Sequence, residues 1–311
     1  MSLKSTVPSG DKQRAMMALE RAVVCAERGV ADRPLTLISP EDLAALSRPD
    51  VRALLDRVMM GDHPDEGLDA LLVSGVLDCI LPEIKALVGF GDGEWRHKDV
   101  WKHTKQVVAQ SVPRIEVRYA SLFHDIGKVK TRSISPEGEV HFFGHAEVGA
   151  RMFDKLERRE RLFSADDNLR TEVRFLVLHH LRASQYDGKW TESAVRRFAR
   201  EIGPYLEDLL CLSRADITTK RPEKKRRGIA LIDELSARIT ELAALDAKEP
   251  PLPTGIGNAL MVHFKLPPSR LIGDIKRALE GAIESGEIAP RLESEAYVGF
   301  VAENKARFGI E

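Results

Sequence analysis

The chain has 311 residues, enough for one large domain or two to three small ones. Hydrophobic residues make up 43% and charged residues 31%, and the net charge of −1 excludes a global field that would draw nucleic acid or membranes to the surface. The three cysteines follow no pairing or metal-binding pattern, no long apolar run is present, and the first residues lack an apolar signal segment. These features predict a cytoplasmic protein that does not enter a membrane.

Helical spacing of apolar residues dominates the start of the chain. A helix is expected over residues 12–28, and Ser39-Pro40 with the following acids predicts a second helix start. Further short helices follow up to a glycine-rich linker at residues 90–93. Residues 1–92 are therefore predicted to form an N-terminal helical region.

Residues 93–222 form the predicted central block, in which residues 131–145 interrupt the helical period. Two short β-prone stretches there flank Pro136-Glu137-Gly138, a pattern typical of a β-hairpin. A basic run, a helix over 228–247, a proline-rich connector and two more short helices are expected in a C-terminal region, 223–311. The predicted fold class is all-α, with a helical core, one small hairpin, and helical N- and C-terminal extensions.

Histidines and aspartates recur in the apolar helical sequence of the central block. Any one histidine on an apolar face is more simply a hydrogen-bonded core residue. Burying many imidazoles and carboxylates together is costly unless they share a cation, and such a set suits Mn, Ni, Co, Fe, Zn or Mg. The set therefore predicts a divalent-metal site, whose candidate ligands are His103, His124, Asp125, His145, His179, His180 and Asp216.

The order of these residues resembles the HD phosphohydrolase superfamily, and residues 124–128 (HDIGK) match its signature turn. Residues 61–84 and 260–288 resemble helical segments that flank the HD module in bacterial tRNA nucleotidyltransferases and poly(A) polymerases. The resemblance covers roughly residues 60 to 290. Those enzymes also have an upstream palm domain with a glycine-rich turn and paired aspartates. Residues 1–60 show neither feature, so nucleotidyl transfer is not expected from this chain.

The resemblance implies one or two metal ions. His103, His124, Asp125 and Asp216 would hold the first, while His145 and one or both of His179 and His180 would hold the second, with Asp125 between them. Helical periodicity leaves open which of the two adjacent histidines is the ligand. The set offers no Ser or Cys nucleophile, so hydroxide is expected to attack directly, with Asp125 and Lys128 as the catalytic residues.

Several cations are candidates for contacts with a substrate phosphate. Lys128 lies one helical turn after the His-Asp pair, and Arg132 and Arg182 flank ligand segments, although each is also compatible with a plain surface role. The basic run Lys220–Arg227 could grip an RNA end, or could be a solvated loop or helix end. The expected partner is a small phosphorylated substrate or an RNA end.

The favoured function is metal-dependent hydrolysis of phosphomonoesters or phosphodiesters in nucleotides or RNA ends, such as 2′,3′-cyclic phosphates. One alternative is a di-iron centre of the same fold that uses dioxygen to cleave carbon bonds. The other is a non-catalytic tRNA- or RNA-binding module with a structural metal. The physiological substrate, the metal and the oligomeric state are left open.

Overall fold

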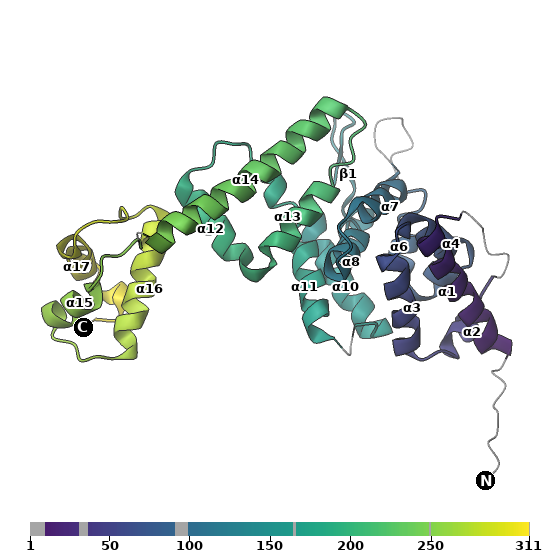
Figure 1. Ribbon diagram of the computed structural model, residues 1–311, viewed down its shortest axis with the longest axis horizontal. Coiled ribbons are helices and arrows are strands. Elements are labelled where there is room, and N and C mark those ends of the chain that lie inside the picture. The colour runs from purple at the N-terminus through teal and green to yellow at the C-terminus, as the bar shows by residue number, and fades with distance from the viewer. Residues whose placement is uncertain (1–9, 31–36, 91–98, 164–165, 249, 311) are drawn as a thin grey trace, which may run out of the picture. The chain divides into compact units, whose positions relative to one another are not determined.

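The computed structural model describes residues 10–30, 37–90, 99–163, 166–248 and 250–310, and these confirm the all-α class with one hairpin (Figure 1). The predicted linker at 90–93 and the 92/93 boundary fall largely outside the described residues. The helices are α1 (Gly10–Arg28), α2 (Pro40–Ala44), α3 (Arg48–Met60), α4 (Pro64–Val73), α5 (Val76–Ile80), α6 (Pro82–Lys85), α7 (Val100–Gln110), α8 (Ile115–Phe123), α9 (Lys128–Thr131), α10 (His145–Glu160), α11 (Asp167–His179), α12 (Glu192–Ile202), α13 (Leu206–Ala215), α14 (Pro222–Lys248), α15 (Ile256–Phe264), α16 (Arg270–Ser285) and α17 (Ser294–Glu303). Short 3-10 segments lie at Ala183–Gln185, Gly203–Tyr205 and Lys305–Phe308.

The N-terminal helices begin where the sequence places their caps. Ser39 caps α2 with a reciprocal pair of bonds: its Oγ accepts from the Asp42 amide, and the Asp42 carboxylate accepts from the Ser39 amide at 2.8 Å. Helix α1 spans the predicted segment and packs on α3 and α4. These contacts bury one apolar face of α1, including Ala22 and Leu19.

The described contacts divide the chain into two compact units. The first contains Met1–Gln185 and Glu207–Ile232, and the second contains Tyr186–Leu206 and Asp233–Glu311. In the first unit, one continuous apolar core runs from α1 through α7 and α8 to α10 and α11. The N-terminal helices thus pack on the same core as the central block, and the predicted boundaries at 92/93 and 222/223 remain a prediction.

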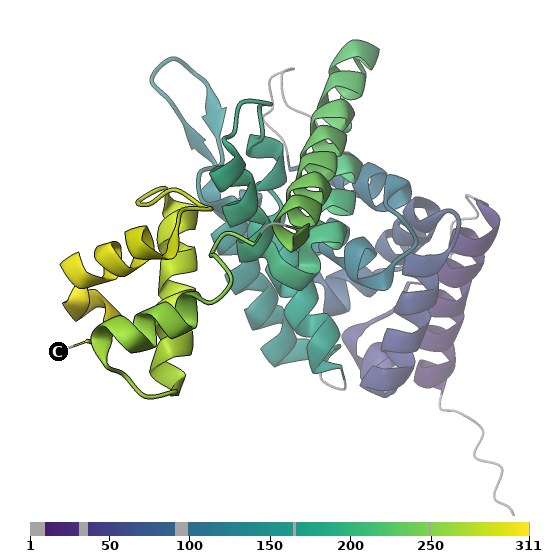
Figure 2. The same cartoon turned by 60° about the vertical axis from the view of Figure 1, so that its left-hand side comes forward.

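The predicted hairpin is confirmed. Strands β1 (Ser133–Ile134) and β2 (Val140–His141) pair antiparallel, with Ser133 opposite His141 and Ile134 opposite Val140. Gly138 in the connecting turn has a φ of 82°, a conformation that glycine adopts without strain. Figure 2 shows the hairpin as a narrow ribbon extending beyond the helices that carry it.

Helix α14 begins at Pro222 and not at residue 228 as expected, so most of the basic run lies within its first turns. Proline suits the first turn of a helix, and lysine and arginine are good helix formers, which explains the earlier start. The second unit has its own apolar core, built from α15, α16 and α17 around Tyr297 and Leu279. No helix of the described residues combines the length and the apolar character needed to cross a membrane.

Candidate metal centre

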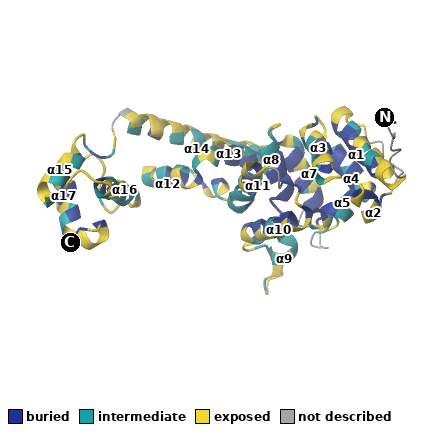
Figure 3. Cartoon of the chain, turned by 90° about the horizontal axis from the view of Figure 1, so that it is seen from below, coloured by how far each residue is buried: buried dark blue, intermediate teal, exposed yellow. Residues whose placement is uncertain are grey.

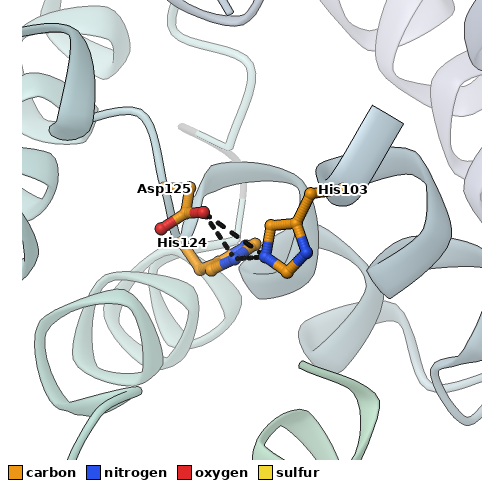
Figure 4. A group of neighbouring side chains, drawn as sticks. All are labelled: His103, His124 and Asp125. Atoms are coloured by element: carbon orange, nitrogen blue, oxygen red, sulfur yellow. Dashed lines mark hydrogen bonds and ion pairs between the residues drawn. The ribbon is translucent and has the colours of Figure 1, made fainter. Parts of the chain in front are cut away.

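A first group of donor atoms gathers around His103, which lies in the middle of α7. Its Nε2 lies 3.2 Å from His124 Nε2, 3.4 Å from Asp125 Oδ2 and 3.0 Å from Asp216 Oδ1. Figure 4 shows His103, His124 and Asp125 pointing toward one another. Donor atoms of these three residues lie within 4.8 Å of one another, and Asp216 Oδ1 adds a further oxygen 3.6 Å from His124 Nε2.

His124 and Asp125, two consecutive residues of the first group, directly follow the end of α8. Neighbouring residues of a regular helix point about 100° apart, so His124 and Asp125 would diverge within a helix. Helix α8 ends at Phe123, however, and the His-Asp pair lies on the turn that follows. His124 itself keeps helical dihedral angles, with a φ of −56° and a ψ of −35°, and Asp125 Oδ2 lies 3.2 Å from its Nε2. Asp216 similarly follows the last residue of α13.

A second group lies on the other side of the Asp125 carboxylate. His145 is the first residue of α10 and His180 directly follows α11, and their Nε2 atoms lie 3.2 Å apart. Asp125 Oδ1 lies 3.6 Å from His145 Nε2, and donor atoms of the three residues lie within 4.8 Å of one another. Asp125 is thus the one residue common to both groups, with a different oxygen toward each.

The outer nitrogen of each ring is held by another group. The Nδ1 atoms of three histidines donate to the backbone carbonyl three residues earlier: His124 to Ser121 at 2.7 Å, His145 to Phe142 at 2.8 Å and His180 to Val177 at 2.8 Å. His103 Nδ1 instead lies 2.9 Å from Thr218 Oγ1. With Nδ1 carrying the proton, the neutral rings of His145 and His180 present the lone pair of Nε2 inward, as metal-ligating histidines do. The sequence does not predict a role for Thr218, because the residue it contacts, His103, is 115 residues away along the chain.

The buried charges of the first group stabilise one another. Burial alone would raise the pKa of Asp125, but the adjacent His124 and Lys128 lower that pKa well below its ordinary value. Burial opposes protonation of His124, yet the Asp125 carboxylate outweighs it and raises the pKa of His124. Burial alone would raise the pKa of Asp216, but the hydrogen bond from His103 together with the charges of His124 and His103 lowers it to about 2. Both carboxylates are therefore ionised at neutral pH, the form that binds cations.

The second group is electrostatically different. Burial, then repulsion from His124, lowers the pKa of His180 to about 4. Burial also lowers the pKa of His145. Both imidazoles are therefore neutral at pH 7, which is the form in which histidine binds a metal. Nitrogen and carboxylate donors in this proportion suit divalent transition metals, so the residues fit the expected cofactor.

Residues 98–221 match the family model of the HD domain. The chain contains an HD domain. An A-adding tRNA nucleotidyltransferase of Deinococcus radiodurans is 30% identical over 256 residues, which are 80% of this chain and 57% of that protein. A CC-adding tRNA nucleotidyltransferase of Thermus thermophilus is 31% identical over 267 residues, 83% of this chain and 57% of that protein. This chain thus spans somewhat more than half the length of these relatives.

A multifunctional CCA protein of Aliivibrio salmonicida is also similar, 31% identical over 47% of this chain and 35% of that protein. These matches confirm the resemblance predicted from the sequence. The matched segment contains every candidate ligand, from His103 to Asp216. In the HD domain, the two donor groups described above come from the ends of α8, α10, α11 and α13, with His103 alone in a helix interior.

His179 lies in neither donor group found among the described residues. Its ring packs against Phe175, with ring centroids 4.3 Å apart, because residues four apart share one helix face. The structure therefore favours His180 over His179 as the donor at the end of α11.

The candidate phosphate contacts lie at different depths in the HD domain. The Lys128 ammonium lies 2.6 Å from Asp125 Oδ2 and 5.6 Å from the centre of the Phe142 ring, so it reaches the donor groups directly. Arg132 is exposed at the end of α9, and Arg182 is half-buried just after α11.

Proposed function

We propose that this chain is a metal-dependent phosphohydrolase acting on nucleotide or RNA-end phosphates, with 2′,3′-cyclic phosphates as the leading substrate. The observation that carries the proposal is the Asp125 carboxylate, which turns one oxygen toward His103 and His124 and the other toward His145. A carboxylate shared between two neighbouring donor groups suits a hydrolytic site that holds two metal ions close together. The names of the relatives support RNA as the substrate class.

The proposed ligands follow the two donor groups. His103, His124, Asp125 and Asp216 would hold one cation, and Asp125, His145 and His180 would hold a second. A divalent metal supplies two things at such a site: it lowers the pKa of a bound water toward neutrality and offsets charge on the phosphate. The chain's own contribution is to fix the orientation of four imidazoles through contacts to their outer nitrogens.

We assign Lys128 the role of a phosphate contact. Its ammonium already lies at the donor groups, where it partly neutralises the buried Asp125. A phosphate that approaches the same place adds negative charge, which the ammonium stabilises most strongly where charge accumulates in the transition state. Arg132 and Arg182 are assigned a lesser role, as positive charges on the approach to the site.

An RNA end is the proposed partner of the basic run. Lys220 and Arg221 follow Thr218, whose hydroxyl contacts His103, so the run starts within a few residues of the metal centre. Lys220 and Arg221 are exposed just before α14. On the first turns of α14, Lys224, Arg226 and Arg227 are exposed, and Lys225 is half-buried and within 3.5 Å of Gln110 Oε1. Exposed cations on one helix attract phosphates without regard to sequence.

The test is hydrolysis by metal-stripped protein to which Mn, Ni, Co, Fe, Zn or Mg is added. The substrates are 2′,3′-cyclic AMP, 2′- and 3′-AMP and a diester, and the controls are His124→Ala and Asp125→Asn. Metal-dependent turnover that both variants lose supports the proposal. Folded, metal-loaded protein that hydrolyses none of them would refute it.

The two alternative functions give different outcomes in the same preparation. Tightly bound iron together with oxygen consumption would indicate the di-iron oxygenase. If His124→Ala lowered the melting temperature but no hydrolysis was seen in either protein, the metal would be structural and the chain a binding module.

A further inference from the structure

Two rings stack on the surface of the hairpin next to the metal centre. The His141 and Phe143 rings are nearly parallel, at 16°, with centroids 4.9 Å apart. His141 is the last residue of β2, and Phe143 lies in the turn that leads from β2 to α10. Phe143 is 76% exposed, and Figure 3 shows the hairpin beyond α9 coloured mainly as exposed.

The stacked pair is tied directly to the second donor group. Phe143 lies two residues before His145, a stretch of chain that spans at most about 7 Å. Its neighbour Phe142 accepts the Nδ1 hydrogen bond of His145, and the Phe142 ring lies 5.6 Å from the Lys128 ammonium. A phosphate held at Lys128 would thus have the exposed face of Phe143 within about the reach of one nucleoside.

We propose that the stacked His141–Phe143 pair receives the base of the nucleotide whose phosphate lies at the metal centre. The inference rests on the proposed phosphohydrolase function and adds the part of the substrate that these residues bind. Every nucleobase has a flat π face that stacks on aromatic side chains, with little dependence on the base. Lys128 and Lys130 in α9 and Arg132 at its end place positive charge at the base of the hairpin, where it complements the phosphate of a nucleotide.

A lone exposed aromatic residue needs no explanation in a globular protein. Phe143 differs because it is stacked on a second ring and joined to a candidate metal ligand through Phe142. Ile134 offers a matched control, since it is also exposed, at 60%, and pairs with Val140. Ile134 therefore lies on the opposite face of the hairpin from His141.

The kinetic test compares kcat/KM for 2′,3′-cyclic AMP with that for the base-free methyl riboside 2′,3′-cyclic phosphate. Phe143→Ala should lower the preference for cyclic AMP on the order of tenfold, the usual effect of removing one stacking ring. Phe143→Trp should retain the preference, and so should Ile134→Ala. An unchanged preference in Phe143→Ala, or an equal loss on both substrates, would overturn the proposal.

A binding test needs no turnover. Adding 2′,3′-cyclic AMP to metal-loaded Phe143→Trp should quench tryptophan fluorescence, whereas the base-free riboside and the Ile134→Trp variant should give no change beyond that of the unmodified protein. If quenching occurs but no variant hydrolyses the substrate, base binding by the His141–Phe143 pair is supported and the phosphohydrolase proposal fails. Absence of quenching at concentrations that saturate turnover, or in a protein without turnover, would refute stacking.

Discussion

At the scale of single residues, the candidate metal centre depends on the hydrogen bond that fixes the Nδ1 atom of each imidazole. Three of the four inward histidines donate to the carbonyl three residues earlier, at distances between 2.7 and 2.8 Å. The carbonyls that accept these bonds lie near the ends of helices or loops, where backbone oxygens lack intrahelical partners. The helix ends thus both expose the histidines and orient them.

His179 and His180 allow a sharp test, because they are adjacent and only one enters a donor group. His180→Ala should remove one equivalent of bound metal and lower kcat at least about 100-fold, because the proposed two-metal site would lose much of its charge stabilisation. His179→Ala should keep the metal content of the unmodified protein. Metal analysis of both purified variants checks this, and loss of metal in His179→Ala alone would reverse the assignment.

Glu172 on α11 carries a pH-dependent contribution to stability. Its burial, together with the hydrogen bond and charge of Asp208, raises the pKa of Glu172 to about 7. A carboxyl whose pKa is higher in the folded state binds its proton more tightly when folded, so the stability it contributes is present below pH 4.5 and lost as the pH rises through 7.

Replacing Glu172 with glutamine should therefore raise the free energy of unfolding at pH 8 and change it little at pH 5, where glutamine resembles the protonated acid. Urea denaturation at both pH values measures the difference. An equal gain at the two pH values would mean that the group is not titrating in this range.

At the scale of elements, the turn after α8 is pressed against the start of α10. A Cβ built on Gly127 would lie 2.0 Å from the His145 carbonyl oxygen and 2.7 Å from the Gly149 amide nitrogen. Only glycine permits this approach, which brings Asp125 and His145 to one site. The glycine of the turn thus fixes the spacing between the two donor groups.

Gly127→Ala should destabilise the protein by about 1–3 kcal/mol, the usual cost of overpacking, and should lower its metal content. Gly149→Ala at the same interface is the control, because its Cβ would meet nothing closer than 3.5 Å. Alanine in a helix interior should stabilise by up to about 1 kcal/mol. Urea denaturation and metal analysis check both, and a neutral Gly127→Ala would contradict the packing argument.

At the scale of the whole molecule, the net charge of −1 conceals a local excess of cations. Lys224 and Arg227 are exposed on the first turns of α14, while Arg226 pairs with Glu223. Local clusters of this kind act on a polyanion even when the total charge is close to zero.

Lys224→Glu combined with Arg227→Glu should weaken binding of a single-stranded RNA about 10- to 100-fold and reduce the slope of log affinity against log salt by about 2. The control is the double variant Lys155→Glu, Arg158→Glu, which makes the same change in charge at two exposed cations on α10. Fluorescence anisotropy at several salt concentrations compares the two double variants. Equal weakening by both would show that the effect is one of net charge.

The sequence by itself determined the helical class, the hairpin and the family resemblance. Each depends on signals that are local in the chain: helical periodicity, the turn Pro136-Glu137-Gly138, and the HDIGK segment with its neighbouring histidines. Such local features can be predicted from the sequence because they depend on backbone geometry within a few residues. The start of α14 was misplaced, since a run of cations favours both loop and helix.

Only the tertiary structure decided which groups meet. Periodicity could not choose between His179 and His180, and it gave no sign that Thr218 lies behind His103 or that Asp125 serves both donor groups. The stacking of His141 on Phe143 likewise depends on the path of the hairpin between α9 and α10. These contacts join residues from many helix ends, and their distances follow from how the helices pack, which no stretch of sequence specifies alone.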